Sequence, residues 1–318
     1  MRLVFLGTPV FAVPTLERLV EAGHQVLAVV TQPDRPRGRG QHAAPPPVKE
    51  AAARLGLAVR QPERVRLPET VEFLRALGAE AMVVVGYGQI IPQSVIDLAP
   101  AGIINVHASL LPKYRGAGPV QWAIVNGETH TGVTTMRIDA GLDTGDMLMK
   151  TGTEIGPDEN AVELGQRLAA MGADLLVETL AGLAAGSIVA EKQDASQATY
   201  ARLLKKEDGL VEWSLPAQSI HNRVRGLQPW PGAYTTFRGQ TLHIWKSRLS
   251  SSPRPPAPGP RPPLPGRVVS VKPLVISCGS GALELLEVQL EGRKRISAAD
   301  FANGQHLTEN EELGGSRL

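Results

Sequence analysis

Short apolar segments alternate with amphipathic segments along residues 1–190. The apolar segments have the length of buried strands and lie at 2–7, 25–31, 80–85, 102–106 and 131–138. The amphipathic segments carry one apolar face and predict helices near 14–23, 47–55, 69–77 and 159–184. This alternation predicts a doubly wound, mostly parallel (Rossmann-like) α/β sheet. Ligands bind at the carboxyl ends of the strands in such sheets, so a site is expected in the segments that follow the strands.

The pattern changes after residue 190. A polar, irregular stretch at 191–208 predicts a linker. Residues 209–318 begin with a short helix and continue as short alternating strands separated by glycine-containing turns. This pattern predicts a small β-barrel or sandwich, and an OB-like β-barrel domain is the form we expect. Eight prolines at 252–266 predict an extended surface loop inserted between two of these strands. The expected organisation is therefore a sheet domain over 1–190, the linker, and a barrel domain over 209–318.

Composition excludes several classes of protein. The longest apolar runs are far too short to span a bilayer, and a strand that begins at residue 2 is typical of a mature cytosolic start rather than a signal peptide. The single cysteine, Cys278, allows no intrachain disulfide and argues against a Cys-based metal site. Residues 209–318 carry 13 basic against 8 acidic side chains. This mildly basic second region favours a polyanionic partner without identifying it.

The stretch INVHASLLPKYRGAGP, at 104–119, carries the first candidate site. Asn105 and His107 are two residues apart in a predicted strand, so both side chains should project from the same face at its carboxyl end, with Val106 turned the other way. An amide can donate a hydrogen bond to an oxyanion, and an imidazole can exchange a proton near neutral pH. Taken alone, an Asn or a His near the end of a strand is more often a polar group that fixes a loop.

A glycine-rich loop one strand further along holds Asp139, Asp143 and Asp146. Consecutive strands of such sheets are usually neighbours, so one of these acids is expected beside His107, where it would orient the imidazole as in an acid–base relay. Ordinary turn chemistry and a metal cage are the alternatives. No cluster of His, Cys or Glu accompanies the loop, so the sequence does not support a metal.

The turn GTPVFA, at 7–12, stands where a dinucleotide-binding fold carries its glycines. Pro9 and Ala12 occupy the second and third glycine positions of that fingerprint. A proline has no N–H for a pyrophosphate to accept from. The sequence therefore excludes an NAD site of the usual kind at this turn.

Four segments together resemble the methionyl-tRNA formyltransferase family. They are FLGTPVFAVPTLERL, TQPDRPRGRG, INVHASLLPKYRGAGPVQWAI and GVTTMRIDAGLDTGDML. The resemblance covers essentially the whole chain, including QPWPGA and the β-rich second region, and the proline-rich insertion departs from it. It implies a cytoplasmic one-carbon transferase that moves the formyl group of 10-formyltetrahydrofolate to the α-amino group of methionine on initiator methionyl-tRNA. No metal or membrane partner is implied, and a monomer is sufficient.

The resemblance also implies roles for individual residues. Asn105, His107 and Asp143 are the implied catalytic trio. Asn105 and a protonated His107 would hold the oxyanion, His107 would protonate the leaving nitrogen N10, and Asp143 would keep His107 oriented and charged. The implied folate-binding residues are Ser109, Leu110, Leu111, Pro112, Gly88 and Ile90. The implied tRNA-binding residues are Arg35, Arg37, Arg39, Lys206 and Arg223.

For some of these residues a plainer interpretation stays open. Ile90 and its neighbour Ile91 could be ordinary core residues. The basic residues Lys205, Lys206, Arg223 and Arg225 could extend a basic track towards the second domain, or they could be solvated surface charges.

Two neighbouring reactions and one role without catalysis also stay open. A formyltransferase acting on an amino-sugar nucleotide, or a formyltetrahydrofolate hydrolase, would keep the trio and the folate loop but leave the arginine-rich loop without a function. A nucleic-acid-binding protein on an idle enzyme scaffold would not need the intact trio.

Overall fold

The structure of the chain, a computed structural model, describes residues 1–37, 42–250 and 264–314. Arg39 and most of the predicted proline-rich insertion lie outside the described residues. The chain divides into two compact units. The first comprises Met1–Pro119, His130–Thr153 and Gly165–Arg202, and the second comprises Val120–Thr129, Glu154–Leu164 and Leu203–Leu318.

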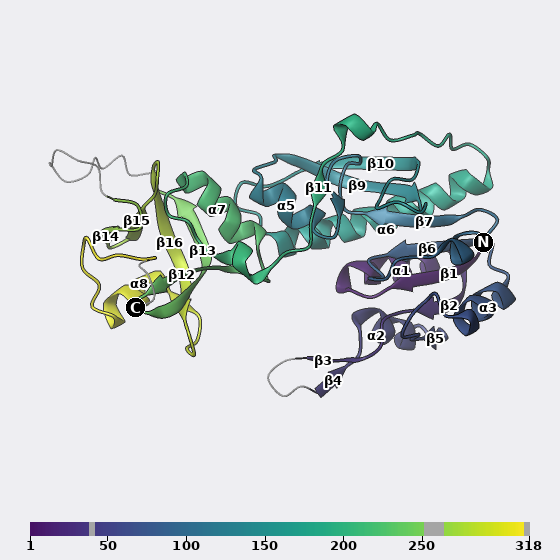
Figure 1. Cartoon of the computed structure of the whole chain (residues 1–318), viewed down its shortest axis with the longest axis horizontal. Coiled ribbons are helices and arrows are strands. Elements are labelled where there is room, and N and C mark those ends of the chain that lie inside the picture. Colours follow the sequence, from purple (N-terminus) through teal and green to yellow (C-terminus); the bar gives the residue numbers. More distant parts are fainter. Residues whose placement is uncertain (38–41, 251–263, 315–318) are drawn as a thin grey trace. The chain divides into compact units, whose positions relative to one another are not determined.

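A seven-stranded sheet forms the first unit, with the strand order β10-β9-β7-β6-β1-β2-β5 (Figure 1). The strands are β1 (Arg2–Gly7), β2 (Gln25–Val30), β5 (Val59–Arg60), β6 (Ala81–Val85), β7 (Ile103–His107), β9 (His130–Arg137) and β10 (Met147–Glu154). The pairs β1–β2, β1–β6, β6–β7 and β2–β5 are parallel, whereas β7 and β9 are antiparallel. The predicted mostly parallel, doubly wound sheet is therefore confirmed.

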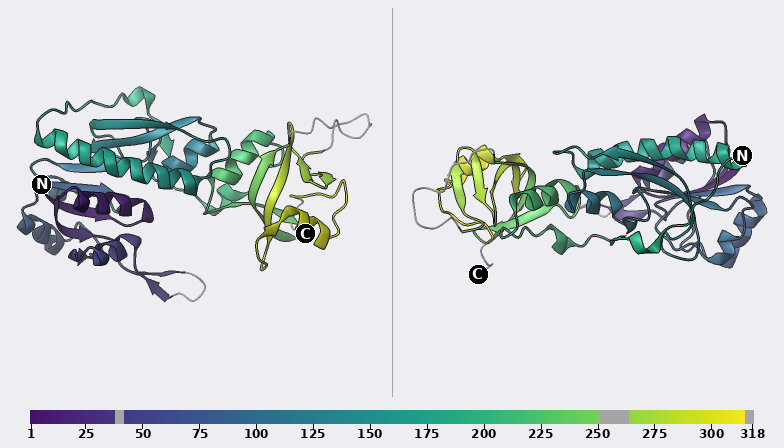
Figure 2. Two further views of the ribbon diagram at one scale, coloured as in Figure 1. Left: turned by 180° about the vertical axis from the view of Figure 1, so that it is seen from behind. Right: turned by 90° about the horizontal axis from the view of Figure 1, so that it is seen from above.

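Helices cover both faces of this sheet. They include α1 (Val13–Glu21), α2 (Pro47–Arg54), α3 (Pro68–Leu77), α4 (Gln93–Ile96) and α6 (Ala161–Ala184). On one face α3 and α4 pack against alternate residues of β1 and β6, such as Val4 and Met82. On the other face α6 lies along the sheet (Figure 2), so close that a Cβ at Gly172 would come within 2.7 Å of Val106. Because β6 and β7 are covered on both sides, every residue of both strands is buried.

The strand order places a switch point at β1. From β1 the chain builds outward through β2 to one side and through β6 and β7 to the other. The register sets Gly7 beside Val85 and sets Val84 beside Asn105. The carboxyl ends of β1, β6 and β7 therefore meet at one edge of the sheet, which is where this fold class binds ligands.

Two segments differ from expectation. The arginine-rich stretch, expected to be a flexible loop, carries a short antiparallel hairpin in which β3 (Arg35–Arg37) pairs with β4 (His42–Ala44). The stretch expected to be a linker, 191–208, is not uniform. Its first part belongs to the first unit, where β11 (Tyr200–Ala201) pairs in parallel with β8 (Arg115–Gly116). Its last residues form a short 3-10 helix, η3 (Lys206–Gly209), in the second unit.

The second unit is an antiparallel β domain. Its strands run in the order β12-β13-β16-β15-β14, and β17 pairs with β16. They are β12 (Ala233–Phe237), β13 (Gln240–Leu249), β14 (Val268–Val271), β15 (Leu274–Ser277), β16 (Ala282–Leu290) and β17 (Ile296–Ser297), accompanied by α5 (Pro119–Val125), α7 (Ala217–Gly226) and α8 (Ala298–Gly304).

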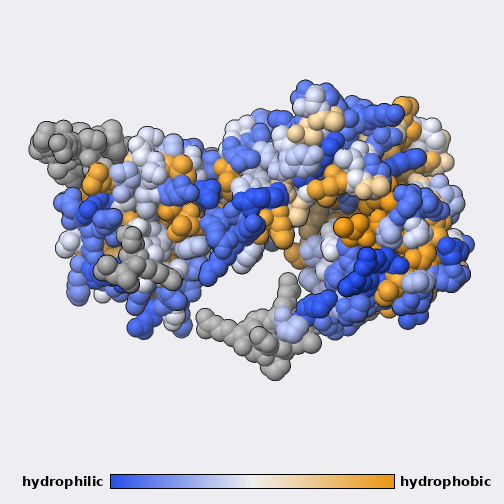
Figure 3. All heavy atoms as spheres, viewed as in Figure 1, coloured by the Kyte–Doolittle hydropathy of each residue, from blue (hydrophilic) through white to orange (hydrophobic). Residues whose placement is uncertain are grey.

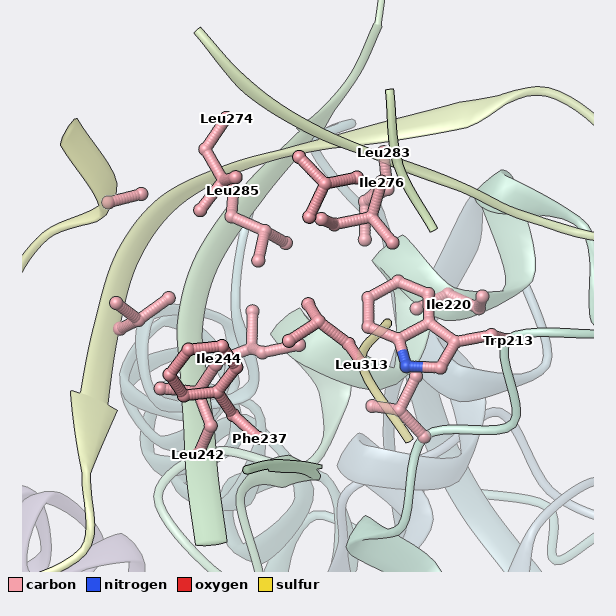
Figure 4. Packing of buried hydrophobic residues seen from close by; sticks show 14 of the residues in the cluster. Trp213, Ile220, Phe237, Leu242, Ile244, Leu274, Ile276, Leu283, Leu285 and Leu313 are labelled. Carbon is pink, nitrogen blue, oxygen red and sulfur yellow. The ribbon is translucent and has the colours of Figure 1, made fainter. Parts of the chain in front are cut away.

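Alternation along β13 shows which face of this sheet is covered. Leu242 and Ile244 are buried, whereas His243 and Trp245 between and beyond them are only half-buried. Figure 4 shows these buried residues gathered with Phe237, Ile220 of α7 and Trp213 around one apolar centre. Period-two burial of this kind is what a sheet with one covered face requires.

No helix within the described parts of the chain combines the length and the apolar character needed to cross a membrane. The face of the molecule seen in Figure 3 carries mostly hydrophilic side chains, interrupted by smaller apolar patches.

Candidate functional site

His107 is the last residue of β7 and is almost fully buried, with 6% of its surface exposed. Its Nε2 atom lies 2.9 Å from the backbone carbonyl oxygen of Tyr114. A carbonyl can only accept a hydrogen bond, so Nε2 carries a proton. The second ring nitrogen, Nδ1, lies 3.7 Å from Oδ2 of Asp143. Both nitrogens thus face oxygen acceptors, and a protonated ring can direct an N–H towards each of them.

Asn105 lies two residues earlier in the same strand and is also buried. Val106, between them, faces Gly172 of α6 on one side of the sheet. Because side chains alternate along a strand, Asn105 and His107 both face the opposite side. The structure therefore places the amide and the imidazole on one face at the carboxyl edge, as the spacing predicted.

Asp143 is the acid of the glycine-rich loop that reaches His107. Its Oδ2 also accepts a hydrogen bond of 2.8 Å from the backbone N–H of Gly116. Its backbone has a φ of 52°, in the left-handed region that residues with a side chain seldom adopt. Asp139 stabilises the turn of this loop instead, because its carboxylate accepts hydrogen bonds from the Gly141 N–H and the Thr144 hydroxyl. One acid pairs with the imidazole and another shapes the loop.

Hydrogen bonds and apolar packing fix the conformation of the loop after β7. Ser109 Oγ donates to the carbonyl of Lys113 at 2.6 Å. The Thr134 hydroxyl donates to the Ser109 carbonyl at 2.7 Å and accepts from the Leu111 N–H at 3.1 Å. The Leu111 side chain packs against Met136 and Met147 in the interior. The side chains of Ser109 and Leu111 are therefore engaged by the protein itself.

Two of the implied folate residues in this loop keep accessible side-chain surface. Leu110 and Pro112 are half-buried, in contrast to their buried neighbours. They follow the catalytic edge of β7 directly, so their apolar surface is available beside it.

The loop after β6 is tied to the turns that follow β1 and β2. The Tyr87 carbonyl accepts from Thr8 Oγ1 at 2.9 Å and from Gln32 Nε2 at 3.1 Å. Gly86 has a φ of 57°, and a Cβ there would lie 2.9 Å from the ring of Pro9. Burial raises the pKa of Tyr87 to about 12, so this phenol stays protonated.

Gly88 and Ile90 lie further along the loop after β6. Gly88 has a φ of 85°, a backbone conformation that glycine adopts without strain. Ile90 is 91% exposed, so interpreting it as a core residue is wrong, whereas Ile91 is buried in the core. A large apolar side chain exposed beside the carboxyl edge is available to cover a bound ligand.

The arginine-rich hairpin presents some of the predicted basic groups. Arg35 is exposed, and its guanidinium lies 3.5 Å from the carboxylate of Glu63. The backbone of Arg37 pairs with His42 across the hairpin. Arg39 lies outside the described residues.

The basic residues of the second unit differ from one another. Lys206 is exposed at the start of η3. Arg223 is half-buried and donates to the Asp208 carbonyl at 2.7 Å. Arg225 is buried and donates to the carbonyls of Gly156 and Glu159. The prediction that Arg225 extends a basic track is therefore wrong, because its guanidinium is used inside the fold.

Sequence reasoning missed two residues that shape the site, Arg115 and Gln193. The Gln193 side-chain amide donates to the backbone carbonyls of Asp143 and Gly145, each at 2.8 Å. Its oxygen accepts from Arg115 at 2.8 and 3.0 Å. Gln193 lies 50 residues beyond Asp143 in a polar, irregular stretch, so no periodicity or spacing marks it.

The fold and the candidate site together have the arrangement expected of a group-transferring enzyme. A doubly wound sheet carries an amide and an imidazole on one face at its carboxyl edge, and a carboxylate lies beside the imidazole. Residues 1–180 match the formyl transferase family, and residues 203–306 match the formyl transferase C-terminal domain. The chain belongs to the formyl transferase family and, within it, to the methionyl-tRNA formyltransferases.

The relatives that support this assignment match at full length. A methionyl-tRNA formyltransferase of Solibacter usitatus is 74% identical over 318 residues, which are 100% of each chain. One of Geobacter metallireducens is 51% identical over 314 residues, or 99% of each chain. An N-formyltransferase structure from Helicobacter canadensis, solved with folinic acid and dTDP-3-aminofucose, superposes with a TM-score of 0.63 at 19% identity, covering 89% of this chain and 98% of that one. That last likeness shows the fold alone.

Proposed function

We propose that this chain transfers the formyl group of 10-formyltetrahydrofolate to the α-amino group of methionine on initiator methionyl-tRNA. The observation that carries the proposal is the 3.7 Å pair of His107 and Asp143 at the carboxyl end of β7, in a chain whose full-length relatives are methionyl-tRNA formyltransferases. The face that these residues share with Asn105 supports chemistry on a carbonyl carbon.

The reaction begins with attack of the neutral methionyl amine on the formyl carbon. A new C–N bond forms, and the formyl oxygen becomes an oxyanion on a tetrahedral carbon. The Asn105 amide supplies one N–H donor for that oxyanion. The protonated His107 ring supplies a second from Nε2, which exchanges its contact with the Tyr114 carbonyl for the oxyanion. Because a free α-amino group has a pKa of about 8, a good share of the acceptor is unprotonated at neutral pH.

Collapse of the tetrahedral carbon breaks its bond to N10 of the folate. His107 donates a proton from Nε2 to N10 as that bond breaks. The attacking amine gives up one proton, which a water relays through Asp143 back to the imidazole, so His107 is charged again after each turnover. The Asp143 carboxylate faces Nδ1 throughout, which orients the ring and stabilises its charged form by ion pairing.

The donor would lie against the loops that follow β6 and β7. Leu110, Pro112 and Ile90 offer apolar surface at this edge, and Gly88 leaves room beside them. An apolar wall with few polar groups suits a flat heterocycle such as a pterin. Ser109 and Leu111 contribute by fixing the loop from within.

Binding of the tRNA is assigned to the arginine-rich hairpin and to the mildly basic second domain. Arg35 is exposed on the hairpin, and Lys206 and Arg223 lie at the start of the second unit. Arginine and lysine contact phosphates, and this contact makes affinity depend on salt. We propose a sheet domain that performs catalysis, a β domain that holds the tRNA, and a monomer that works in the cytoplasm, where translation starts.

Replacing Arg39 of the arginine-rich stretch should weaken use of the tRNA. For Arg39→Ala we expect kcat/KM for methionyl-tRNA to fall about tenfold or more, with a shallower salt dependence, because phosphate or base-edge contacts are lost. Affinity for the formyl donor should not change. The matched control is Arg54→Ala, which removes an exposed arginine that pairs with Glu17 of α1. Wild-type tRNA kinetics in Arg39→Ala would contradict the assignment.

The function itself is tested by offering 10-formyltetrahydrofolate with three acceptors in parallel. The acceptors are methionyl initiator tRNA, an amino-sugar nucleotide and water alone. Formyl-methionine formed only with the tRNA is the expected result. Formylated sugar, or release of tetrahydrofolate without an acceptor, would keep the catalytic chemistry but overturn the substrate.

A further inference from the structure

A segment far along the chain returns to the catalytic edge. This segment, residues 193–201, is here called the strap. Its strand β11 pairs with β8, next to the loop that follows β7. The Thr199 carbonyl accepts from the Arg115 N–H at 2.9 Å, and Thr199 Oγ1 accepts from the Tyr114 N–H at 2.9 Å. The strap thus binds the backbone whose Tyr114 carbonyl contacts His107.

The side chain of Gln193, at the start of the strap, joins this loop to the loop of Asp143. Its Nε2 donates to the carbonyls on both sides of the left-handed turn, those of Asp143 and Gly145. Its Oε1 accepts from both Nε and Nη2 of Arg115, a residue only 4% exposed. A buried guanidinium requires such an acceptor, so the Gln193 amide is fixed at both ends.

These contacts connect Gln193, the Arg115–Gly116 segment and the loop of Asp143 to one another. Arg115 is followed by Gly116, whose N–H donates to Asp143 Oδ2. The backbone of Asp143 has a strained φ of 52° and keeps it only while its neighbours hold it. Gln193 supplies that restraint from one side and Gly116 from the other. Both contacts fix the loop whose carboxylate lies 3.7 Å from Nδ1 of His107.

We infer that Gln193 is a positioning residue for formyl transfer, which acts by holding Asp143 against His107. The inference rests on the proposed function, and it goes beyond it by assigning part of the catalytic geometry to a side chain 50 residues away from the carboxylate. Gln193 acts through Asp143, and its effect should appear in turnover rather than in binding.

The variant Gln193→Glu separates this role from folding. A glutamate keeps the acceptor for Arg115 but has no N–H, so it loses both hydrogen bonds to the Asp143 loop and sets an oxygen against two carbonyls. We expect kcat to fall about 10- to 100-fold, with KM for either substrate changed less than about threefold. Should Gln193→Glu not fold, Gln193→Asn carries the same test, because its amide is one methylene short of the carbonyls.

The neighbouring residue in the strap provides the control. Asp194 is exposed, and its carboxylate bonds to Ser196 within its own turn. Asp194→Ala should keep kcat within about twofold of the wild type, since it removes no contact to the Asp143 loop. Equal losses in Asp194→Ala and Gln193→Glu would overturn the inference, because they would indicate a general effect of the strap.

A double-mutant cycle decides whether Gln193 acts through Asp143. In an Asp143→Ala background, Gln193→Glu should lower the single-turnover rate by less than about threefold further. Losses that multiply would overturn the inference.

The proposed function fails separately, if the wild type does not formylate methionyl-tRNA. Wild-type transfer together with full kcat in Gln193→Glu would overturn this inference alone.

Discussion

The variant His107→Ala should lose formyl transfer almost completely, with kcat lowered by about a thousandfold or more. The substitution removes one donor to the oxyanion and the acid that protonates N10. Affinity for 10-formyltetrahydrofolate should stay close to that of the wild type, because Thr134 fixes the donor loop independently of the imidazole. Single-turnover formylation of methionyl-tRNA measures the first effect, and equilibrium binding of the donor measures the second.

An exposed histidine of the same unit is the matched control. His130 lies at the start of β9 with its side chain on the surface, and His130→Ala should transfer formyl at a rate within about twofold of the wild type. Turnover by His107→Ala at the wild-type rate would remove this residue from the mechanism.

The second large effect is expected for Asp143→Asn, with a fall in kcat of about 10²- to 10⁴-fold. An asparagine keeps the size of the side chain and an oxygen to accept from Gly116. It removes the negative charge that faces Nδ1 of His107, so the charged ring is no longer stabilised where it must act. The rate is to be measured with saturating donor and tRNA, so that it reports kcat.

Asp139→Asn provides the comparison within the same loop. Asp139 bonds to Gly141 and Thr144 and shapes the turn, and its asparagine can accept the same hydrogen bonds. We expect its kcat to fall less than about tenfold. If Asp139→Asn were as damaging as Asp143→Asn, the loss would reflect the loop's structure and not a charge paired with His107.

The sequence predicts those features that depend on local periodicity. Two-residue spacing placed Asn105 and His107 on one face of β7, and Val106 faces α6 on the other, as alternation requires. The order of strands and helices was sufficient to predict the parallel sheet and the edge at which its candidate site lies. By contrast, three acids in one flexible, glycine-containing loop are equivalent in sequence. Only the backbone conformation at Asp143 shows which of them reaches the imidazole.

Features that depend on contacts between distant segments could not be predicted. Gln193 and Arg115 are separated by 78 residues and share no pattern. The burial of individual basic side chains could not be predicted from the sequence either. Arg223 and Arg225 lie two positions apart on one helix, but only Arg225 of the two is buried. Charge in the sequence therefore overestimates the basic surface of the second unit. It also cannot show that part of the presumed linker is an integral piece of the catalytic unit.

The contact between Pro9 and Gly86 has a consequence for how this fold is used. In sheets of this kind the turn after β1 usually stays open to receive phosphates. Here the pyrrolidine ring occupies the space beside Gly86, so closely that even a methyl group there would collide with it. At this point the turn after β1 packs directly against the loop after β6. The same contact supports the loop that presents Ile90, and the catalytic pair lies further along the edge, at the end of β7.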